Sequence, residues 1–263
     1  MPKAKRHVPK EDGEAIQPQG QTARQRRRAQ QTRSKRQGQM VLVLILGGVF
    51  LLVAALVSQG SQPVDTSTLI DPAPRAHPDA ADNVIGSPDA KVVLTEYSDF
   101  NCSACQSFWL QIETIVIDQY VSTGKIRFEY RSANDFLGPT SADAAEAAYC
   151  AGKQDRFWDM HDMIFTNFVL HNTSGYTSGV LTGMAEKLGL DMNAYDDCVD
   201  SGEMRDRLDA DGEAFRAVNQ NLIDAGESYG TPTLAINGER VDIVSSWDEL
   251  FAALDAAVAA AGQ

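Results

Sequence analysis

Two cysteines separated by two residues are the first feature of the sequence that could do chemistry. They stand in the run Cys102-Ser103-Ala104-Cys105. A disulfide needs Cα atoms roughly 4.4–6.8 Å apart, and one helical turn brings Cys105 within that reach of Cys102. A helix N-terminus also carries partial positive charge and unpaired N–H groups, which stabilise a thiolate on the first cysteine. The pair therefore predicts a site of thiol–disulfide exchange.

Other interpretations of the cysteine pair are weaker. A CxxC pair can be half of a zinc site, but such a site needs two more ligands. The remaining cysteines stand singly, and His161 and His171 lie in an unrelated pattern. We therefore expect no metal and no cofactor, while a purely structural disulfide stays open as an alternative.

Glu96 is a candidate for proton transfer because it lies six residues before Cys102 on a predicted strand. Alternation places it on one face of a strand that otherwise consists mostly of apolar residues. A buried carboxyl has a raised pKa and can pass protons during thiol exchange. The alternative is an exposed acid at a strand edge, and we favour the functional role.

The other two cysteines are candidates for a structural disulfide. Four cysteines allow three pairings, and a redox pair at 102 and 105 leaves only Cys150 with Cys198. An oxidising compartment would let that disulfide persist, and two free buried thiols are the alternative. His161 shares the apolar face of its predicted helix, so we interpret it as a core histidine.

The elements around the cysteine pair predict a β-α-β unit. Residues 91–97 are mostly apolar and β-branched, which is typical of a buried strand. A helical pattern follows the pair and ends at Gly124, and residues 125–131 alternate as a second strand. This order places the cysteines between a buried strand and the helix that follows it.

The second half of the chain completes an α/β fold. Residues 140–225 have helical patterns throughout, and strand character returns at residues 233–236. Asn237-Gly238 is a two-residue hairpin signal, and a return strand at residues 239–244 and a closing helix follow. The sequence therefore predicts a sheet interrupted by an all-helical insertion over about residues 140–225.

The N-terminal region predicts a membrane topology. Residues 40–57 carry no charge, which is about the minimum length for a transmembrane helix, so we place an anchor at residues 40–58. The basic residues before it favour a cytoplasmic N-terminus and an extracytoplasmic C-terminal domain. A cleavable signal peptide is the rival interpretation.

The segments on either side of the predicted anchor have the compositions of a tail and a tether. Residues 1–39 hold 11 of the 23 Lys and Arg and few large apolar side chains, so we expect a basic, disordered cytoplasmic tail that contacts anionic lipid. Binding of RNA or a protein partner by this tail is the alternative. Residues 59–83 are rich in Pro and Ser and predict a linker.

Charge and composition exclude several classes of protein. The 263 residues are 43% hydrophobic and contain only four cysteines, which excludes low-complexity chains and small disulfide scaffolds. Beyond residue 39 the chain has 12 basic and 33 acidic residues, which makes that part strongly acidic. Such a surface repels phosphate backbones, so we expect no nucleic acid as a partner.

Three motifs together resemble the DsbA-like thioredoxin-fold oxidoreductases, and the membrane-anchored bacterial type most closely. They are Glu96-Tyr97-Ser98-Asp99-Phe100-Asn101-Cys102-Ser103-Ala104-Cys105, the run AAYCAGKQDRFWDMHDMIF at residues 147–165, and Gly230-Thr231-Pro232-Thr233. The resemblance covers residues 84–262. It implies a thioredoxin-like sheet with an inserted all-helical subdomain.

The resemblance also implies a role for each matching residue. Cys102 would be the reacting thiol and Cys105 the buried resolving thiol. Pro232 would be a cis-proline that faces the disulfide, and the backbone of Thr231 would bind the substrate peptide. Glu96 would match the family's buried acid, and a second disulfide in the insertion would fit Cys150 and Cys198.

The implied activity is disulfide formation in reduced secreted proteins. A membrane partner of the DsbB or VKOR type would reoxidise the pair. The sequence departs from the family in the dipeptide Ser103-Ala104, where many members have Pro and often His. Without that His the thiolate loses a stabilising charge, which keeps a reductase or isomerase open. A peptide-binding chaperone without redox activity is a third hypothesis.

Overall fold

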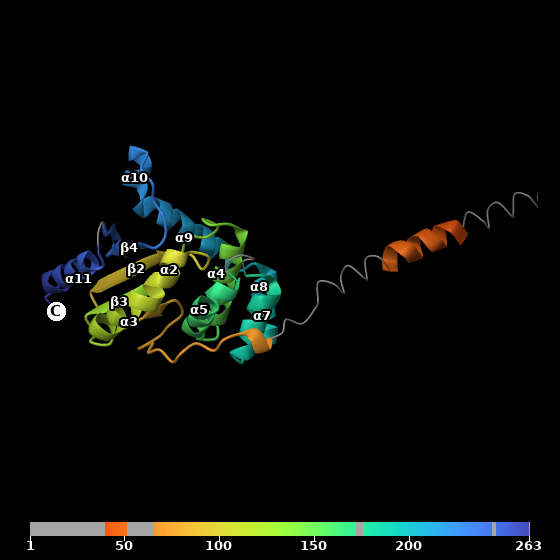
Figure 1. Ribbon diagram of the computed structural model, residues 1–263, viewed down its shortest axis with the longest axis horizontal. Coiled ribbons are helices and arrows are strands. Elements are labelled where there is room, and N and C mark those ends of the chain that lie inside the picture. Colours follow the sequence, from red (N-terminus) through yellow and green to blue (C-terminus); the bar gives the residue numbers. More distant parts are fainter. Residues whose placement is uncertain (1–39, 52–65, 172–175, 244–245, 263) are drawn as a thin grey trace, which may run out of the picture. The chain divides into compact units, whose positions relative to one another are not determined.

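The computed structural model describes residues 40–51, 66–171, 176–243 and 246–262 (Figure 1). The chain divides into two units, Met1–Ser61 and Gln62–Gln263, and the described part of the first unit is an exposed helix over residues 40–51.

The described residues give the predicted membrane anchor no support. None of their helices combines the length and apolar character needed to cross a bilayer. Part of the prediction at residues 40–58 is not tested, because residues 52–58 lie outside the described residues. The predicted tail at residues 1–39 also lies outside them.

A five-stranded mixed sheet forms the centre of the second unit, with the strand order β1-β3-β2-β4-β5. β2 (Val92–Ser98) lies in the middle, parallel to β3 (Ile126–Ser132) and antiparallel to β4 (Thr233–Ile236). The predicted α/β sheet is therefore confirmed. The edge strand β1 (Val84–Ile85) has only two residues, which is too short to give a periodic signal in the sequence.

The crossover between β2 and β3 is a single helical run with two π-helical turns in it. Its parts are α2 (Ser103–Phe108), η2 (Trp109–Glu113), α3 (Thr114–Val116) and η3 (Ile117–Val121). It begins directly after the cysteine pair's first thiol and ends before Gly124, which has the positive φ of 74° that glycine adopts without strain.

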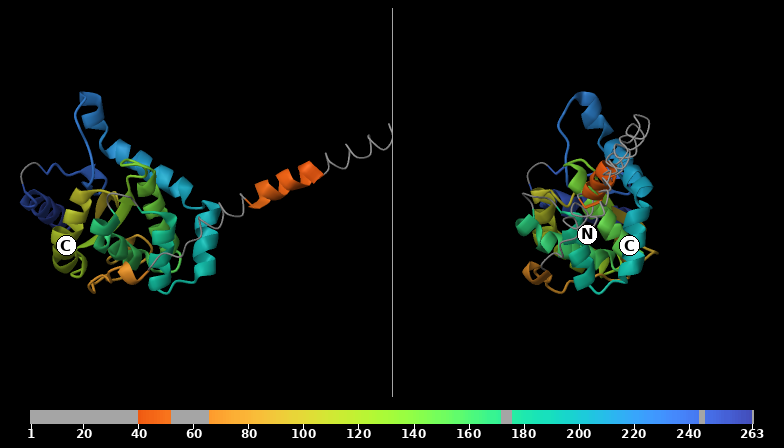
Figure 2. Two further views of the ribbon diagram at one scale, coloured as in Figure 1. Left: turned by 45° about the vertical axis from the view of Figure 1, so that its right-hand side comes forward. Right: turned by 90° about the vertical axis from the view of Figure 1, so that its right-hand side faces the viewer.

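The helical insertion is present as predicted. Figure 1 shows its helices α4, α5, α7 and α8 gathered at one end of the sheet, with α9 running back toward β4. The helices are α4 (Pro139–Gly152), α5 (Phe157–Thr166), α6 (Phe168–His171), α7 (Ser178–Lys187), α8 (Met192–Ser201), α9 (Arg205–Val218) and α10 (Gln220–Ala225). Figure 2 shows α10 projecting from the rest of the domain.

A hairpin and a helix close the domain. Asn237 and Gly238 have positive φ values of 52° and 87°, as a tight hairpin turn requires, and they join β4 to the edge strand β5 (Glu239–Arg240). β5 is shorter than the return strand predicted at residues 239–244. The last helix, α11 (Asp248–Ala260), buries Leu250, Leu254 and Val258.

Part of the predicted linker packs against the insertion. The amide N–H of Ile70 donates to Oδ1 of Asn167 at 2.8 Å, and the same side chain's Nδ2 donates to the Ile70 carbonyl at 2.9 Å. Nζ of Lys187 donates to the carbonyl of Leu69 at 3.0 Å. These hydrogen bonds fix the backbone of Leu69 and Ile70 at the start of a segment that we call the N-terminal segment (residues 69–77).

Candidate active site

Cys102 occupies the N-cap position of α2. Its backbone is extended, with φ −92° and ψ 120°, and its Sγ accepts a hydrogen bond from the Cys105 N–H at 3.3 Å. The sulfur therefore lies where the unpaired N–H groups of the helix start converge, which is the position that stabilises a negative charge. Only 7% of the residue is exposed.

Hydrogen bonds lower the pKa of Cys102 to about 6. The Cys105 thiol contributes most, Thr231 and the backbone of the first turn contribute as well, and burial works in the opposite direction. No cationic side chain is among these causes. Hydrogen bonds without a neighbouring cation therefore favour the thiolate form of Cys102 at neutral pH.

Cys105 lies one turn along α2 and is completely buried. Burial raises the pKa of its thiol well above the ordinary value, and the hydrogen bond to Cys102 and the charge of Glu96 raise it further. Both sulfurs are free. The pair thus combines an ionised thiol near the surface with a protonated thiol inside, which is the asymmetry that disulfide exchange uses.

The loop before β4 brings Thr231 and Pro232 to the cysteine pair. Sγ of Cys102 lies 3.2 Å from the Thr231 carbonyl oxygen, to which it donates when it is protonated, and the Thr231–Pro232 peptide bond is cis. Asn219, buried between α9 and α10, donates to Oγ1 of Thr233 at 3.3 Å and to the Phe215 carbonyl at 2.9 Å. Asn219 therefore fixes Thr233, the residue that follows Pro232, to the end of α9.

Glu96 lies on β2 with its side chain in the core, and only 1% of the residue is exposed. The pKa of its carboxyl is raised to about 8. Burial is the largest cause and the Cys102 charge acts in the same direction, while nearby Ser98 offsets part of the increase. A carboxyl that titrates near neutral pH beside a buried thiol can exchange protons with it.

Sequence reasoning missed the residues that hold the loop before α2. Asp99 accepts from the N–H of Asn101 at 2.8 Å and from the N–H of Leu137 at 3.2 Å. The Asn101 amide donates to Oγ1 of Thr140 at 2.8 Å and to Oγ of Ser141 at 3.1 Å. The run Asp-Phe-Asn before the first cysteine was a possible signal, because Asp and Asn commonly bond to nearby backbone in turns.

Cys150 and Cys198 are far in sequence from the redox pair and form a disulfide with a sulfur–sulfur distance of 2.03 Å. The bond joins α4 to α8 and is buried within the insertion.

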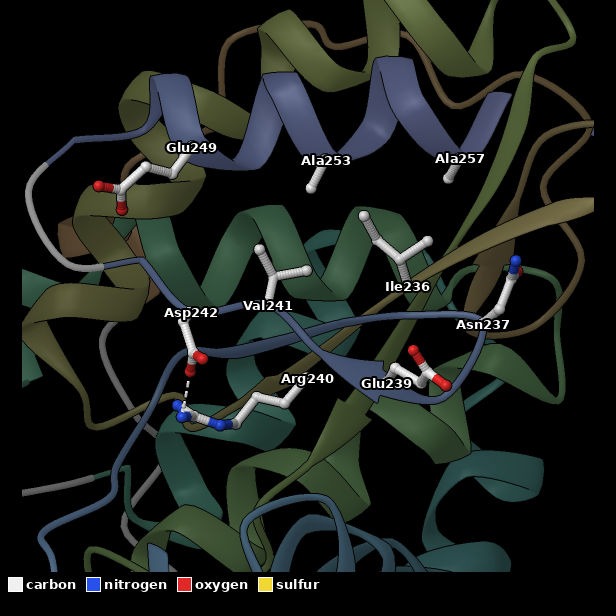
Figure 3. Close-up of a pocket in the computed structure, with 9 residues that line it drawn as sticks. All are labelled: Ile236, Asn237, Glu239, Arg240, Val241, Asp242, Glu249, Ala253 and Ala257. Carbon is white, nitrogen blue, oxygen red and sulfur yellow. Dashed lines mark hydrogen bonds and ion pairs between the residues drawn. The ribbon is translucent and has the colours of Figure 1, made fainter. Parts of the chain in front are cut away.

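Two surface hollows lie near the β4–β5 hairpin. One, of about 320 Å³, is lined by residues 228–234, which include Thr231 and Pro232, and therefore opens beside Cys102. The other, of about 620 Å³, lies between the hairpin and α11 (Figure 3). Its rim carries an Arg240–Asp242 ion pair, and its lining does not include Thr231 or Pro232, so the first hollow is the candidate for a bound substrate.

Comparisons with known proteins agree with this geometry. A family model described as thioredoxin matches residues 79–256, and the chain therefore belongs to the thioredoxin family. The structure of BdbD from Bacillus subtilis superposes with a TM-score of 0.57 and 21% identity, over 72% of this chain and 99% of that one.

One relative is named for disulfide bond formation. Disulfide bond formation protein D of Bacillus subtilis is 23% identical over 170 residues, which are 64% of this chain and 72% of that protein. Together with the DsbA-like structural neighbours, this shows that the chain is similar to thiol–disulfide oxidoreductases of the DsbA-like type.

Another relative is a much longer protein that resembles this chain over part of its length. Na(+)/H(+) antiporter NhaA 1 of Salinispora arenicola is 32% identical over 162 residues, which are 60% of this chain. The chain spans only 22% and 28% of the first two curated relatives it matches.

Proposed function

We propose that the protein is an oxidase that forms disulfides in secreted proteins through Cys102 and Cys105. The observation that carries this proposal is the position of Sγ of Cys102 at the N-cap of α2, where hydrogen bonds lower its pKa to about 6. A stabilised thiolate favours the reduced enzyme and so makes the disulfide a strong oxidant. We assign Cys102 as the reacting sulfur and Cys105 as the resolving one. Glu96 is the proton-transfer acid in this proposal.

The reaction starts from the Cys102–Cys105 disulfide. A substrate thiolate attacks Sγ of Cys102, the sulfur–sulfur bond breaks, and Cys105 leaves as a thiolate that takes a proton from Glu96. A second substrate thiolate then attacks the mixed disulfide and releases oxidised substrate with Cys102 as the thiolate. In this proposal Thr231 and Pro232 bind the substrate backbone, and the hollow beside them receives its side chains.

The cellular setting is also part of the proposal. The uncharged stretch at residues 40–58 would anchor the chain, with residues 1–39 in the cytoplasm and the domain at residues 84–262 outside it. Residues 59–83 would join the two parts. A partner of the DsbB or VKOR type in the same membrane would return the enzyme to its disulfide form.

The absence of a cation among the groups that stabilise Cys102 favours a second candidate, a reductase or isomerase. Both candidates use the same residues and differ in the direction of electron flow. Oxidation of a reduced test protein by the pre-oxidised chain distinguishes them, because a reductase would leave the test protein's thiols free.

The test of the shared site is Cys102→Ser, which should abolish exchange, whereas Cys150→Ala/Cys198→Ala should retain it. Full dithiol oxidation by Cys102→Ser would overturn the proposed function.

A further inference from the structure

A buried cluster of charged groups lies against the crossover helix, and the exchange mechanism above does not use it. Glu113 comes from η2, and His161 and Asp162 come from α5. Glu113 and His161 are completely buried, and 3% of Asp162 is exposed. Three ionisable side chains are costly to bury together unless their protons and charges are organised.

The atoms of this cluster form a continuous series. Oε2 of Glu113 lies 3.8 Å from Nε2 of His161, and Nδ1 of the same ring lies 3.1 Å from Oδ1 of Asp162. Oδ2 of Asp162 then lies 3.2 Å from Nε2 of His77 in the N-terminal segment. The series therefore alternates carboxyl, imidazole, carboxylate and imidazole.

Burial and neighbouring groups shift the pKa of each of the three side chains. Burial raises the pKa of Glu113 well above its ordinary value, while Arg75 offsets part of the increase. Burial lowers the pKa of His161. Burial also opposes ionisation of Asp162, but its hydrogen bonds to the two imidazoles overcome this and lower its pKa. These directions favour a protonated Glu113 that faces the Nε2 lone pair of a neutral His161, with the Nδ1–H of that ring donating to ionised Asp162.

Glu113, the innermost residue of the series, is connected with the cysteine pair through Glu96. Glu96 and Tyr130 are partners across β2 and β3, and the Tyr130 ring lies 5.4 Å from that of His161, so Glu96 and the cluster lie on one side of the sheet. The charge of Glu96 also raises the pKa values of Glu113 and Cys105. Among the described residues, neither Glu96 oxygen has a hydrogen-bond partner within bonding distance, and the same holds for Oε2 of Glu113 and Nε2 of His161. Unpaired buried polar atoms are uncommon and often mark catalytic sites.

The outer end of the series reaches the surface in the N-terminal segment. The side chains of Arg75 and His77 are 11% and 13% exposed. Arg75 donates to Oε1 of Glu113 at 3.2 Å and to the carbonyl of Trp109 at 2.9 Å, and it borders a surface hollow of about 480 Å³. The His77 ring stacks on Trp158 with centroids 5.5 Å apart.

We propose that Glu113, His161 and Asp162 are a proton relay that connects Glu96 with solvent at His77. The proposal rests on the assignment of Cys102 and Cys105 as a redox pair. Neither Glu113 nor His161 touches a reacting sulfur, so both are positioning residues that act through Glu96.

The relay accounts for one proton in each half of the redox cycle. When the pair is oxidised, one proton leaves the core: Glu96 gives its own proton toward Glu113 and takes the proton of Cys105. Glu113 passes a proton to Nε2 of His161 while Nδ1–H passes one to Asp162, which transfers it to His77. When the pair is reduced, the Cys105 thiolate takes a proton and the same steps run inward, which restores the original tautomer of His161.

A cation site is the alternative use of these side chains, but one oxygen of Asp162 and one of Glu113 already accept hydrogen bonds from other residues. The Trp109 indole N–H donates to Oδ1 of Asp162 at 2.8 Å, and the Arg75 guanidinium bonds to Glu113. A positive guanidinium within the cluster repels a metal ion.

The test uses the full chain with glutathione, which needs no protein substrate. We expect Glu113→Gln and His161→Gln to slow exchange about tenfold at pH 7, because a positioned proton-transfer group commonly contributes at least that much. The rate should also lose its solvent deuterium isotope effect and change the shape of its pH profile, while the reduction potential stays unchanged. His77→Gln, at the surface, should act in the same direction without opening the core.

The matched control is Glu146→Gln, which removes a carboxyl that is also buried but is paired with Arg205 in the insertion. This variant should keep the rate and the pH profile of the unmodified chain. Folded Glu113→Gln, His161→Gln and His77→Gln variants with unchanged rates and pH profiles would overturn the relay, and so would equal slowing by Glu146→Gln. A chain that exchanges with glutathione through the relay but does not oxidise a reduced test protein would contradict only the proposed function.

Discussion

Hydrogen bonds rather than a neighbouring cation set the reactivity of Cys102. Its sulfur receives the N–H of Cys105 at the start of α2, and the Cys105 thiol is the strongest of the groups that lower its pKa. Such donors depend on the geometry of the helix start, so the dipeptide between the cysteines matters less than the position of the N-cap.

Alkylation of the reduced chain by iodoacetamide tests this view of Cys102. We expect a rate that rises with pH around a midpoint of about 6, rather than around the ordinary value of 9.0. Cys105→Ala removes the strongest donor and should move the midpoint upward. A midpoint near 9 in the unmodified chain would contradict the assignment of Cys102 as a thiolate.

Glu96 should make the stability of the fold depend on pH. Its folded pKa of about 8 lies above the ordinary 4.5, so its contribution is fully present below pH 4.5 and is lost as the pH rises through 8. Glu96→Gln should remove this dependence and stabilise the chain at pH 9 by on the order of 2–5 kcal/mol. Denaturant unfolding at pH 5 and pH 9 measures the difference, and identical pH dependence in the variant would contradict the raised pKa.

At the scale of single residues, the sequence predicts the site residues that belong to a recognisable motif. It misses the residues that support the site through contacts in the folded chain. Cys102, Cys105 and Glu96 follow from spacing and strand alternation. Asn219 and Asp99 carry no such signal, because their partners come from distant parts of the chain and from the folded loop.

At the scale of elements, the crossover helix shows how a charged residue can be missed on a buried face. Trp109, Ile112, Glu113 and Val116 are buried at the spacing of a regular helix, whereas Ile115 stays half-buried. The π-helical turns η2 and η3 lie in this helical run, and π turns occur often at functional sites. An apolar pattern does not reveal Glu113 as a core residue, because charged residues are seldom fully buried without a partner.

The Cys150–Cys198 disulfide should act on the insertion and not on the chemistry. It closes a loop with a sequence separation of 48, so its removal should cost about 2–4 kcal/mol through the unfolded chain's entropy. Cys150→Ala/Cys198→Ala should unfold at lower denaturant concentration while exchange at Cys102 keeps its rate. A variant with unchanged stability would contradict a structural role for the bond.

At the scale of the whole molecule, the order of elements follows from the sequence because each has a local signal. The packing of the N-terminal segment does not. Its Pro-rich composition favours a tether, yet Asn167 and Lys187 bind its backbone, and Arg75 and His77 enter the buried cluster. These contacts join residues that are between 38 and 118 positions apart in sequence, which no local pattern reveals.

The direction of electron flow is a property of the whole molecule, because the reduction potential compares the stability of two complete folded states. A thiolate stabilised at Cys102 favours the reduced state, so the reduced chain should unfold at a higher denaturant concentration than the oxidised one. Equilibrium of the full chain with glutathione should then give a potential closer to the roughly −120 mV of DsbA than to the roughly −270 mV of thioredoxin. A value near the latter, with the oxidised state the more stable, would assign the same residues to a reductase that needs an electron donor across the membrane.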